Sequence, residues 1–335
     1  MDIITHALAS TAVARALLPR ASKLLWGAVI VAGVIADADA ISAAFGPATF
    51  LRWYRTYTHS IVAAVLFALI TFLAYKIFSG PEPPAKFSSG TVFLAALLAS
   101  LLHAGMDSCQ WQGVQLFWPP GRKIVAADWL PTIDPWILSI LIASLVLPEL
   151  FHLVNAEIGM RERGPRGRVA ASLGLFLVFF YIGARAALHS GAVAQLQART
   201  FGGEPARRAA AFARPISLFT WDGLVDTENA VHVVTVKTGP GIPEEPQTTL
   251  KVFKPAPSSY LEVAQNTVAA RLFLQHARFP KAAVLQNGGG WKIEIRDIRD
   301  AEPGGWLRQV AAIVEINEAG AVTAQEIIWS KDSGR

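Results

Sequence analysis

Four short polar clusters interrupt this apolar chain, and each lies at the end of a hydrophobic segment. They are Thr5-His6, Asp37-Ala38-Asp39, Thr58-His59-Ser60 and the stretch from His103 to Asp107. Imidazole nitrogens and carboxylate oxygens are suitable ligands for zinc and similar divalent metals. At i, i+4 spacing near a helix end, His103 and Asp107 share one helix face. We therefore expect one metal site, with the ligands His6, Asp37, Asp39, His59, His103 and Asp107.

Each pair of candidate ligands also has a plainer interpretation. Asp37 and Asp39 follow an apolar helix, where two carboxylates repel each other and meet an unfavourable helix dipole, and a cation would relieve both effects. The alternative is a solvated turn, and alternation in an extended segment favours only one direct ligand of the two. His6 and His59 each follow a threonine at a helix start, where a single histidine is more often an interfacial residue. Thr58 is expected to cap the helix after it.

Further candidates lie in the connections beside these clusters. Arg55, Arg122 and Lys123 are expected to bind an anionic substrate group and to stabilise charge in the transition state, which makes Arg55 a candidate catalytic residue. Trp118 belongs to an aromatic, proline-rich loop suited to hold an amphiphilic substrate. Asp134 precedes Pro135, so it either caps the next helix or acts as a catalytic residue.

The composition indicates an integral membrane protein. Of 335 residues, 53% are hydrophobic and 16% are charged, and the mean hydropathy is +0.38. Candidate spans are Ser60 to Ile77, Thr91 to Leu102, Trp136 to Val154 and Val169 to Leu188, the one at Thr91 only if it continues to about Cys109. Ala7 to Leu18 and Leu24 to Ala36 are shorter, which predicts a helical hairpin dipping into the membrane, with two short tilted spans as the alternative. The N-terminus lacks signal-peptide features and is expected to be retained.

Basic residues predict the orientation of the chain. They concentrate in residues 15–23, 76–86 and 161–168, which are therefore expected on the cytoplasmic side of a bacterial inner membrane. The polar clusters and everything after Leu188 then face outward. These arginines also account for the net charge of +5, so the charge gives no argument for nucleic-acid binding.

The fold class expected is an all-α helical membrane bundle, residues 1–190, followed by a small extracytoplasmic α+β domain, residues 191–335. Alternating stretches predict strands at Val231–Val236, Trp291–Ile295, Val310–Ile316 and Ala321–Trp329. One helix is expected over Ser258–Ala277, and an Ala/Arg/Gly-rich linker around residues 202–214. The single Cys109 excludes an intrachain disulfide.

The order of these motifs resembles the YdjM-type membrane-bound metal-dependent hydrolases. The resemblance covers about the first 155 residues and includes Arg55-Thr56-Tyr57-Thr58-His59-Ser60, Gly113 through Trp118-Pro119, and Ile133-Asp134-Pro135. It implies a distant relation to zinc-dependent phospholipase C and P1-type nucleases, which are helical and hydrolyse phosphoesters at a multinuclear metal centre. Tyr54 stands where members often have a histidine, and Ala36 replaces an expected proline, so fewer metals or a changed outer contact are the implied consequences.

Together these observations predict a metal-dependent hydrolase of a phosphoester or ester in a lipid or lipid-linked substrate. One or two divalent ions would activate water, with zinc as the default metal and manganese a close second. The alternative is a non-catalytic membrane anchor or metal-binding protein that displays the C-terminal domain to a partner. A metal carrier is disfavoured because spans such as Ser60 to Ile77 have apolar centres.

Overall fold

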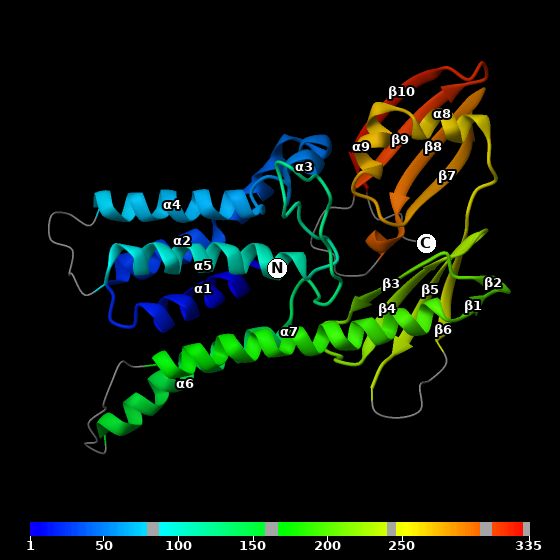
Figure 1. Ribbon diagram of the computed structural model, residues 1–335. Helices are drawn as coiled ribbons and strands as arrows, with labels where there is room; N and C mark the ends of the chain where they lie inside the picture. Colours follow the sequence, from blue (N-terminus) through cyan, green and yellow to red (C-terminus); the bar gives the residue numbers. More distant parts are fainter. Residues whose placement is uncertain (79–86, 158–166, 240–245, 302–309, 331–335) are drawn as a thin grey trace.

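The computed structural model describes residues 1–78, 87–157, 167–239, 246–301 and 310–330, in which a helical bundle is followed by two four-stranded β-sheets and one two-stranded sheet (Figure 1). The bundle comprises α1 (Ile3–Leu17), α2 (Lys23–Val34), the 3-10 helix η1 (Ile35–Phe45), α3 (Pro47–Trp53), α4 (Ile61–Phe78), α5 (Ser89–Ser108), α6 (Pro135–Glu157) and α7 (Arg168–Gln197). The predicted fold class, a helical membrane bundle followed by an α+β region, is confirmed.

Five segments of the described chain are long and apolar enough to cross a membrane. They are Lys23–Phe45, Ile61–Phe78, Ser89–Ser108, Pro135–Asn155 and Arg168–Gln197. The helix expected to continue from Thr91 to about Cys109 does so. α1 is a shorter apolar helix, whereas α2 with η1 reaches the length of a span, which favours a crossing for this segment. The basic connections at 79–86 and 161–166 lie outside the described residues.

Local capping explains where the first helices begin. The Asp2 carboxylate accepts a hydrogen bond from the Thr5 amide at 2.9 Å and starts α1. Ser22 does the same for α2 through the Leu25 amide at 3.2 Å. Figure 1 shows that the connection between these two helices lies at one end of the bundle, while the first residues of α1 lie at the other end, which faces the sheets.

The C-terminal region contains two antiparallel four-stranded sheets, ordered β3-β4-β5-β6 and β10-β9-β8-β7, and a two-stranded sheet β1-β2. The strands are β1 (Thr200–Phe201), β2 (Glu204–Pro205), β3 (Arg208–Ala213), β4 (Thr220–Asp226), β5 (Ala230–Lys237), β6 (Gln247–Phe253), β7 (Pro280–Asn287), β8 (Gly290–Asp297), β9 (Val310–Asn317) and β10 (Val322–Trp329), with a short 3-10 helix η2 (Ile298–Ala301) after β8. All four predicted strands are present, as β5, β8, β9 and β10.

Two predictions for this region are wrong. The stretch from Gly202 to Arg214 is not a linker: it contains β2 and β3, and β3 buries Ala210, Ala211 and Phe212. Alanine has little intrinsic preference for strands, so packing and not local propensity determines this element. The helix expected over Ser258–Ala277 is two helices, α8 (Ser259–Gln265) and α9 (Val268–Leu274), because the Thr267 hydroxyl caps the second through the Ala270 amide.

Both sheets pack against the helical bundle. Ala192 and Leu196 of α7 lie in one cluster with Trp221 and Val234 of the first sheet. α7 therefore continues beyond the boundary predicted near residue 190, and the division into residues 1–190 and 191–335 stays a prediction. Phe50 of α3 shares a cluster with α8, α9 and the second sheet. The sheets thus cover the end of the bundle at which the polar clusters lie (Figure 1).

Candidate metal centre

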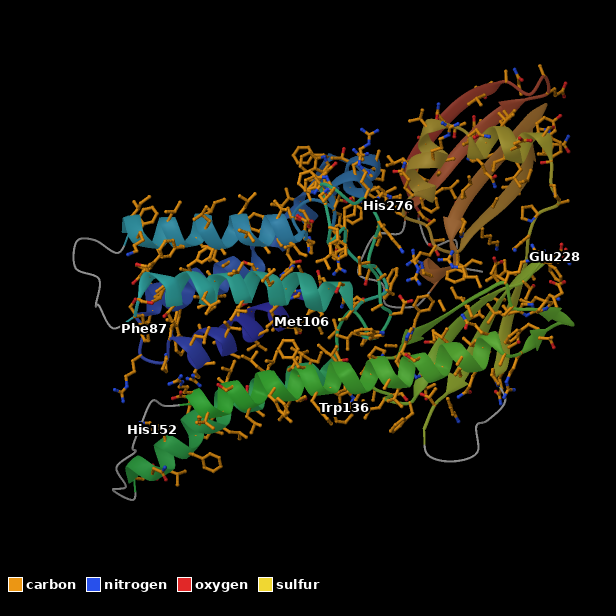
Figure 2. The ribbon with its side chains drawn as sticks, viewed as in Figure 1. Phe87, Met106, Trp136, His152, Glu228 and His276 are labelled. Carbon is orange, nitrogen blue, oxygen red and sulfur yellow. The ribbon has the colours of Figure 1, made fainter. Side chains whose placement is uncertain are left out.

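The polar clusters meet at the end of the bundle that faces the sheets. His6 comes from the start of α1, Asp37 and Asp39 from η1, His59 from the residues before α4, and His103 and Asp107 from the last turns of α5. Met106, which lies beside Asp107 in the chain, is labelled at this end in Figure 2. Segments that are up to a hundred residues apart in sequence therefore converge on one place.

Four of the six predicted ligands form one compact group. Each of His6, Asp37, His103 and Asp107 offers an atom that lies within 4.8 Å of the corresponding atoms of the others. His59 adjoins this group, with Nε2 at 3.1 Å from Asp107 Oδ2 and 3.6 Å from Asp37 Oδ1. Asp107 is fully buried and is the centre of these contacts. The amino group of Met1 also contacts its Oδ1.

Hydrogen bonds that Nδ1 donates orient two of the histidines. His103 Nδ1 lies 2.7 Å from the Gly33 carbonyl oxygen, which can only accept, so the proton is on Nδ1 and the Nε2 lone pair faces Asp37 and Asp107. His59 Nδ1 lies 2.9 Å from the Thr58 hydroxyl oxygen, whose own proton goes to Asp39 Oδ2 at 2.6 Å, so Nδ1 of His59 carries its proton as well. An outer acceptor that fixes one ring nitrogen is the usual companion of a metal-binding imidazole.

Asp39 contributes through His59 and the backbone instead of joining the group of four. Its Oδ2 accepts hydrogen bonds from the Arg55 amide at 2.7 Å and from the Thr58 hydroxyl at 2.6 Å. The expectation that only one of the two η1 aspartates is a direct ligand therefore agrees with the geometry. The prediction that Thr58 caps α4 is wrong. The Ser60 hydroxyl takes that role and accepts a hydrogen bond from the Ala63 amide.

The donor atoms fit a divalent cation. Asp37 Oδ2, His59 Nε2, His103 Nε2 and Asp107 Oδ2 are buried and have no hydrogen-bond partner among the described residues. Burying lone pairs in this way is costly unless a cation satisfies them. Mixed nitrogen and oxygen donors suit zinc, and manganese to a similar degree.

Arg55 brings a buried positive charge to this group. One guanidinium nitrogen donates to Gln110 Oε1 at 2.9 Å and lies 3.2 Å from Asp107 Oδ2. Its Nε and Nη1 are buried without a hydrogen-bond partner in the described chain. The backbone of Arg55 has φ of 57°, a strained value for a residue with a side chain, and the Asp39 hydrogen bond to its amide helps to hold it.

A close helix contact supplies the carbonyl that orients His103. A Cβ on Gly33 would lie 1.8 Å from Ser10 Oγ and 3.3 Å from the Ala99 Cβ, so only glycine permits α1 and α5 to approach α2 here. Neither Gly33 nor Gln110 was a predicted site residue. A glycine four residues before Asp37 was the available signal for the first, and no sequence pattern marked the role of the second.

The remaining predicted residues lie outside the group of donors. Arg122 and Lys123 are exposed, and neither contacts the group within the described chain. Trp118 packs edge-on against Tyr57, with ring centroids 5.1 Å apart, and Tyr57 packs against Trp53 in the same way at 5.0 Å. Substrate-binding roles for these three residues stay predictions.

Asp134 caps a helix. Its Oδ1 accepts the amides of Trp136 and Ile137 at 3.0 and 3.1 Å, and its Oδ2 accepts the Tyr181 hydroxyl at 2.9 Å. Burial raises the pKa of this carboxyl, and the hydrogen bonds oppose that rise. Both oxygens are thus engaged, which favours the capping alternative over the predicted catalytic role.

The two positions that depart from the expected motif differ in their surroundings. Tyr54 stacks on Phe50 with ring centroids 4.5 Å apart, and both belong to the cluster shared with the second sheet. Ala36 is buried in η1, directly before Asp37. The residue at 54 therefore belongs to the contact between the bundle and the sheets.

The fold and the site define a multi-pass helical membrane protein with a buried His/Asp group that could hold a metal ion. By sequence, the chain belongs to the YdjM inner membrane protein family, whose model matches residues 1–192. The match ends within α7, so the sheets lie beyond it. No curated protein and no solved structure matches the chain.

Proposed function

We propose that this protein is a membrane-bound metal-dependent hydrolase that cleaves a phosphoester or ester in a lipid or lipid-linked substrate. The observation that carries the proposal is the convergence of His59 Nε2 and His103 Nε2 on the two carboxylates Asp37 and Asp107. The Nδ1 atoms of both rings contact outer oxygen atoms, which orients both Nε2 atoms for an ion. The distant relation to zinc-dependent phospholipase C and P1-type nucleases, which the family resemblance implies, is part of this proposal.

The metal would be held by His6, Asp37, His103 and Asp107, with His59 beside them and Asp39 orienting His59. One or two ions, zinc or manganese, would act as a Lewis acid and lower the pKa of a coordinated water from about 15.7 towards about 7. Arg55 supplies two guanidinium nitrogens beside this group that have no hydrogen-bond partner among the described residues. They bind an anionic oxygen of the substrate and stabilise the negative charge that grows in the transition state.

Exposed apolar residues around the site support a lipid substrate. Phe45, Trp53 and Phe117 are 73%, 53% and 55% exposed in the segments that surround the predicted ligands. Aromatic residues in such positions favour the boundary between hydrocarbon and water. Basic Arg15, Arg20 and Lys23 lie at the opposite end of the bundle, so the positive-inside rule supports an outward-facing site and C-terminal region.

The test combines metal content with activity on phospholipid, phosphodiester and simple ester substrates. We expect purified protein to hold zinc or manganese and to hydrolyse at least one class, and His103→Ala to lose both properties. His152→Ala is the matched control, since His152 lies in α6 at the far end of the bundle (Figure 2). Less than about a tenth of an equivalent of metal in protein purified without chelator contradicts the proposal.

The competing function is a metal-binding anchor that displays the sheets to a partner. It predicts bound metal without turnover on any substrate class. It also predicts that Arg55→Gln leaves the metal content unchanged and has no turnover to lose, because an anchor has no transition state to stabilise. The same two measurements therefore separate the two functions.

A further inference from the structure

The C-terminal region contacts the connection that closes the metal centre. Residues 109–134 link α5 to α6, and the amides of Ala127 and Trp129 bond the carbonyls of Ser108 and Cys109, immediately after Asp107. Asp128 lies between these two amides. Both of its oxygens accept hydrogen bonds from the guanidinium of Arg278, at 2.6 and 2.7 Å. The pair is largely buried. Because two nitrogens of the guanidinium contact the two carboxylate oxygens, the ion pair is strong and directional.

A second contact holds the same connection at Trp111. The Arg299 guanidinium donates to the Trp111 carbonyl at 3.0 Å and lies over its indole ring at 5.2 Å. Trp111 also packs into the cluster formed by Phe212, Phe279 and Ile298, between the two sheets. The neighbouring Gln110 is the residue that accepts from Arg55, and its amide nitrogen donates to the carbonyls of Pro131 and Thr132.

A third contact approaches Arg55 from its other side. Phe50 and Tyr54 stack on each other within the cluster that includes Phe273 and Trp329 of the C-terminal region. Phe50 and Trp329 have ring centroids 5.4 Å apart. Because Tyr54 immediately precedes Arg55, the backbone of Arg55 is anchored on this side and its guanidinium on the other.

We propose that the C-terminal region is a positioning element of the metal centre that holds Arg55 in its strained conformation beside Asp107. Its contacts reach Arg55 through Tyr54 on one side, and on the other through Asp128 and Trp111 in the connection that carries Gln110. The inference rests on the proposed function, in which Arg55 binds the substrate anion. It assigns Arg278 and Asp128 as positioning residues. In this inference the sheets support the site of the proposed hydrolase, whereas in the competing anchor function they are displayed to a partner.

The experiment removes the ion pair between Arg278 and Asp128 in the full-length protein. The double variant Asp128→Asn with Arg278→Gln removes the ion pair without leaving one buried charge alone, and asparagine tolerates the left-handed φ of 64° at position 128. The probe is inorganic phosphate, titrated calorimetrically into zinc-loaded protein. We expect phosphate to bind about tenfold more weakly, as for coupled groups in one network, with the zinc content unchanged.

Epistasis with Arg55 distinguishes positioning from a general structural role. In an Arg55→Gln background the double variant should cost no further phosphate affinity, because the residue through which it acts is gone. Arg278→Lys, which keeps one charged contact, should recover part of the loss. Arg214→Gln is the matched control, since it breaks an ion pair with Asp222 inside the first sheet and should leave phosphate binding unchanged.

A readout independent of zinc and phosphate keeps this inference separate from the proposed function. Hydrogen exchange of residues 54–60 should accelerate in the double variant and not in Arg214→Gln. Unchanged exchange there, or an equal loss of phosphate affinity with and without Arg55, overturns the positioning role. Absence of metal in the wild-type protein overturns the proposed function, and the exchange measurement still decides the positioning role.

Discussion

Asp107 in the bundle and Asp297 in the second sheet are both buried carboxylates, and their neighbours differ in kind. Asp297 accepts from the amides of Arg278 and Arg299 and pairs with the Arg299 guanidinium at 2.7 Å. Asp107 lies among His6, His59 and His103, keeps an oxygen without a hydrogen-bond partner, and has Arg55 at its edge. The first arrangement completes a fold, whereas the second belongs to a group of donors that could hold a metal ion.

Removing the carboxylate at the site should have the largest effect. Asp107→Ala deletes the donor that contacts every histidine of the group, so we expect metal affinity to fall by more than about a hundredfold, beyond the usual contribution of outer contacts. Competition with a chelator, followed by elemental analysis, measures this loss. Full retention of metal would show that Asp107 resembles Asp297 after all.

Removing the other carboxylate should damage folding and spare the metal. Asp297→Asn leaves the buried guanidinium of Arg299 without its counter-ion, for which we expect a loss of about 3–5 kcal/mol in the free energy of unfolding. Denaturant titration followed by tryptophan fluorescence measures it. A fall in metal content equal to that of Asp107→Ala would contradict the contrast between the two residues.

Acid should affect the sheets through the same residue. Burial raises the pKa of Asp297, but Arg299 and the amide hydrogen bonds outweigh it and hold this pKa below its ordinary value. A carboxyl with a depressed folded pKa stabilises the fold above its unfolded pKa of about 3.9, and that stability is lost as the pH falls further. We expect the stability difference between wild type and Asp297→Asn to shrink below about pH 4, measured by unfolding at a series of pH values. A constant difference down to about pH 2 would exclude this linkage.

Crowding the bundle behind His103 should have a smaller effect. Gly33→Ala places a methyl group against Ser10 Oγ and displaces the carbonyl that orients His103, at a cost of about 1–3 kcal/mol in stability together with weaker metal binding. Thermal unfolding and metal titration measure the two effects. Ser10→Gly should rescue the variant. Gly27→Ala is the control in the same helix, because nothing lies within 4 Å of its added Cβ.

The smallest effect is expected at the residue that orients His59. Asp39→Asn keeps the shape of the side chain but removes the charge facing His59 Nδ1, so metal affinity should fall by about tenfold. Metal titration beside Asp37→Asn measures the difference between the two η1 residues. If Asp39→Asn proves the more damaging of the two, Asp39 is a direct ligand.

The helices and the position of the site could be predicted because both depend on features summed over many residues. Apolar segments indicate spans by length alone, and polar groups at their ends are few enough to be compared. The different roles of Asp37 and Asp39 could not be settled, since they depend on which ring nitrogen of His59 each side chain of the 3-10 helix faces. Gly33 and Gln110 act through a backbone carbonyl and a side-chain amide, which no spacing reveals.

The sheets were predicted less completely for a related reason. β5, β8 and β9 carry buried β-branched residues, whereas β3 is rich in alanine and β6 is exposed along nearly its whole length. Their strand pairing is determined by neighbours that are distant in sequence, such as α7 beneath β3 and Lys251 opposite His232. Local patterns contain little of that information.

The continuous helix α7 has one more consequence, which concerns size. Its 30 residues measure about 45 Å, and the hydrocarbon layer takes about 30 Å, so roughly 15 Å stands outside the membrane. Ala192 and Leu196 near its end are locked into the first sheet. The packing therefore fixes the distance between the sheets and the membrane surface, and in the proposed hydrolase this distance would limit the size of the lipid headgroup that the site could admit.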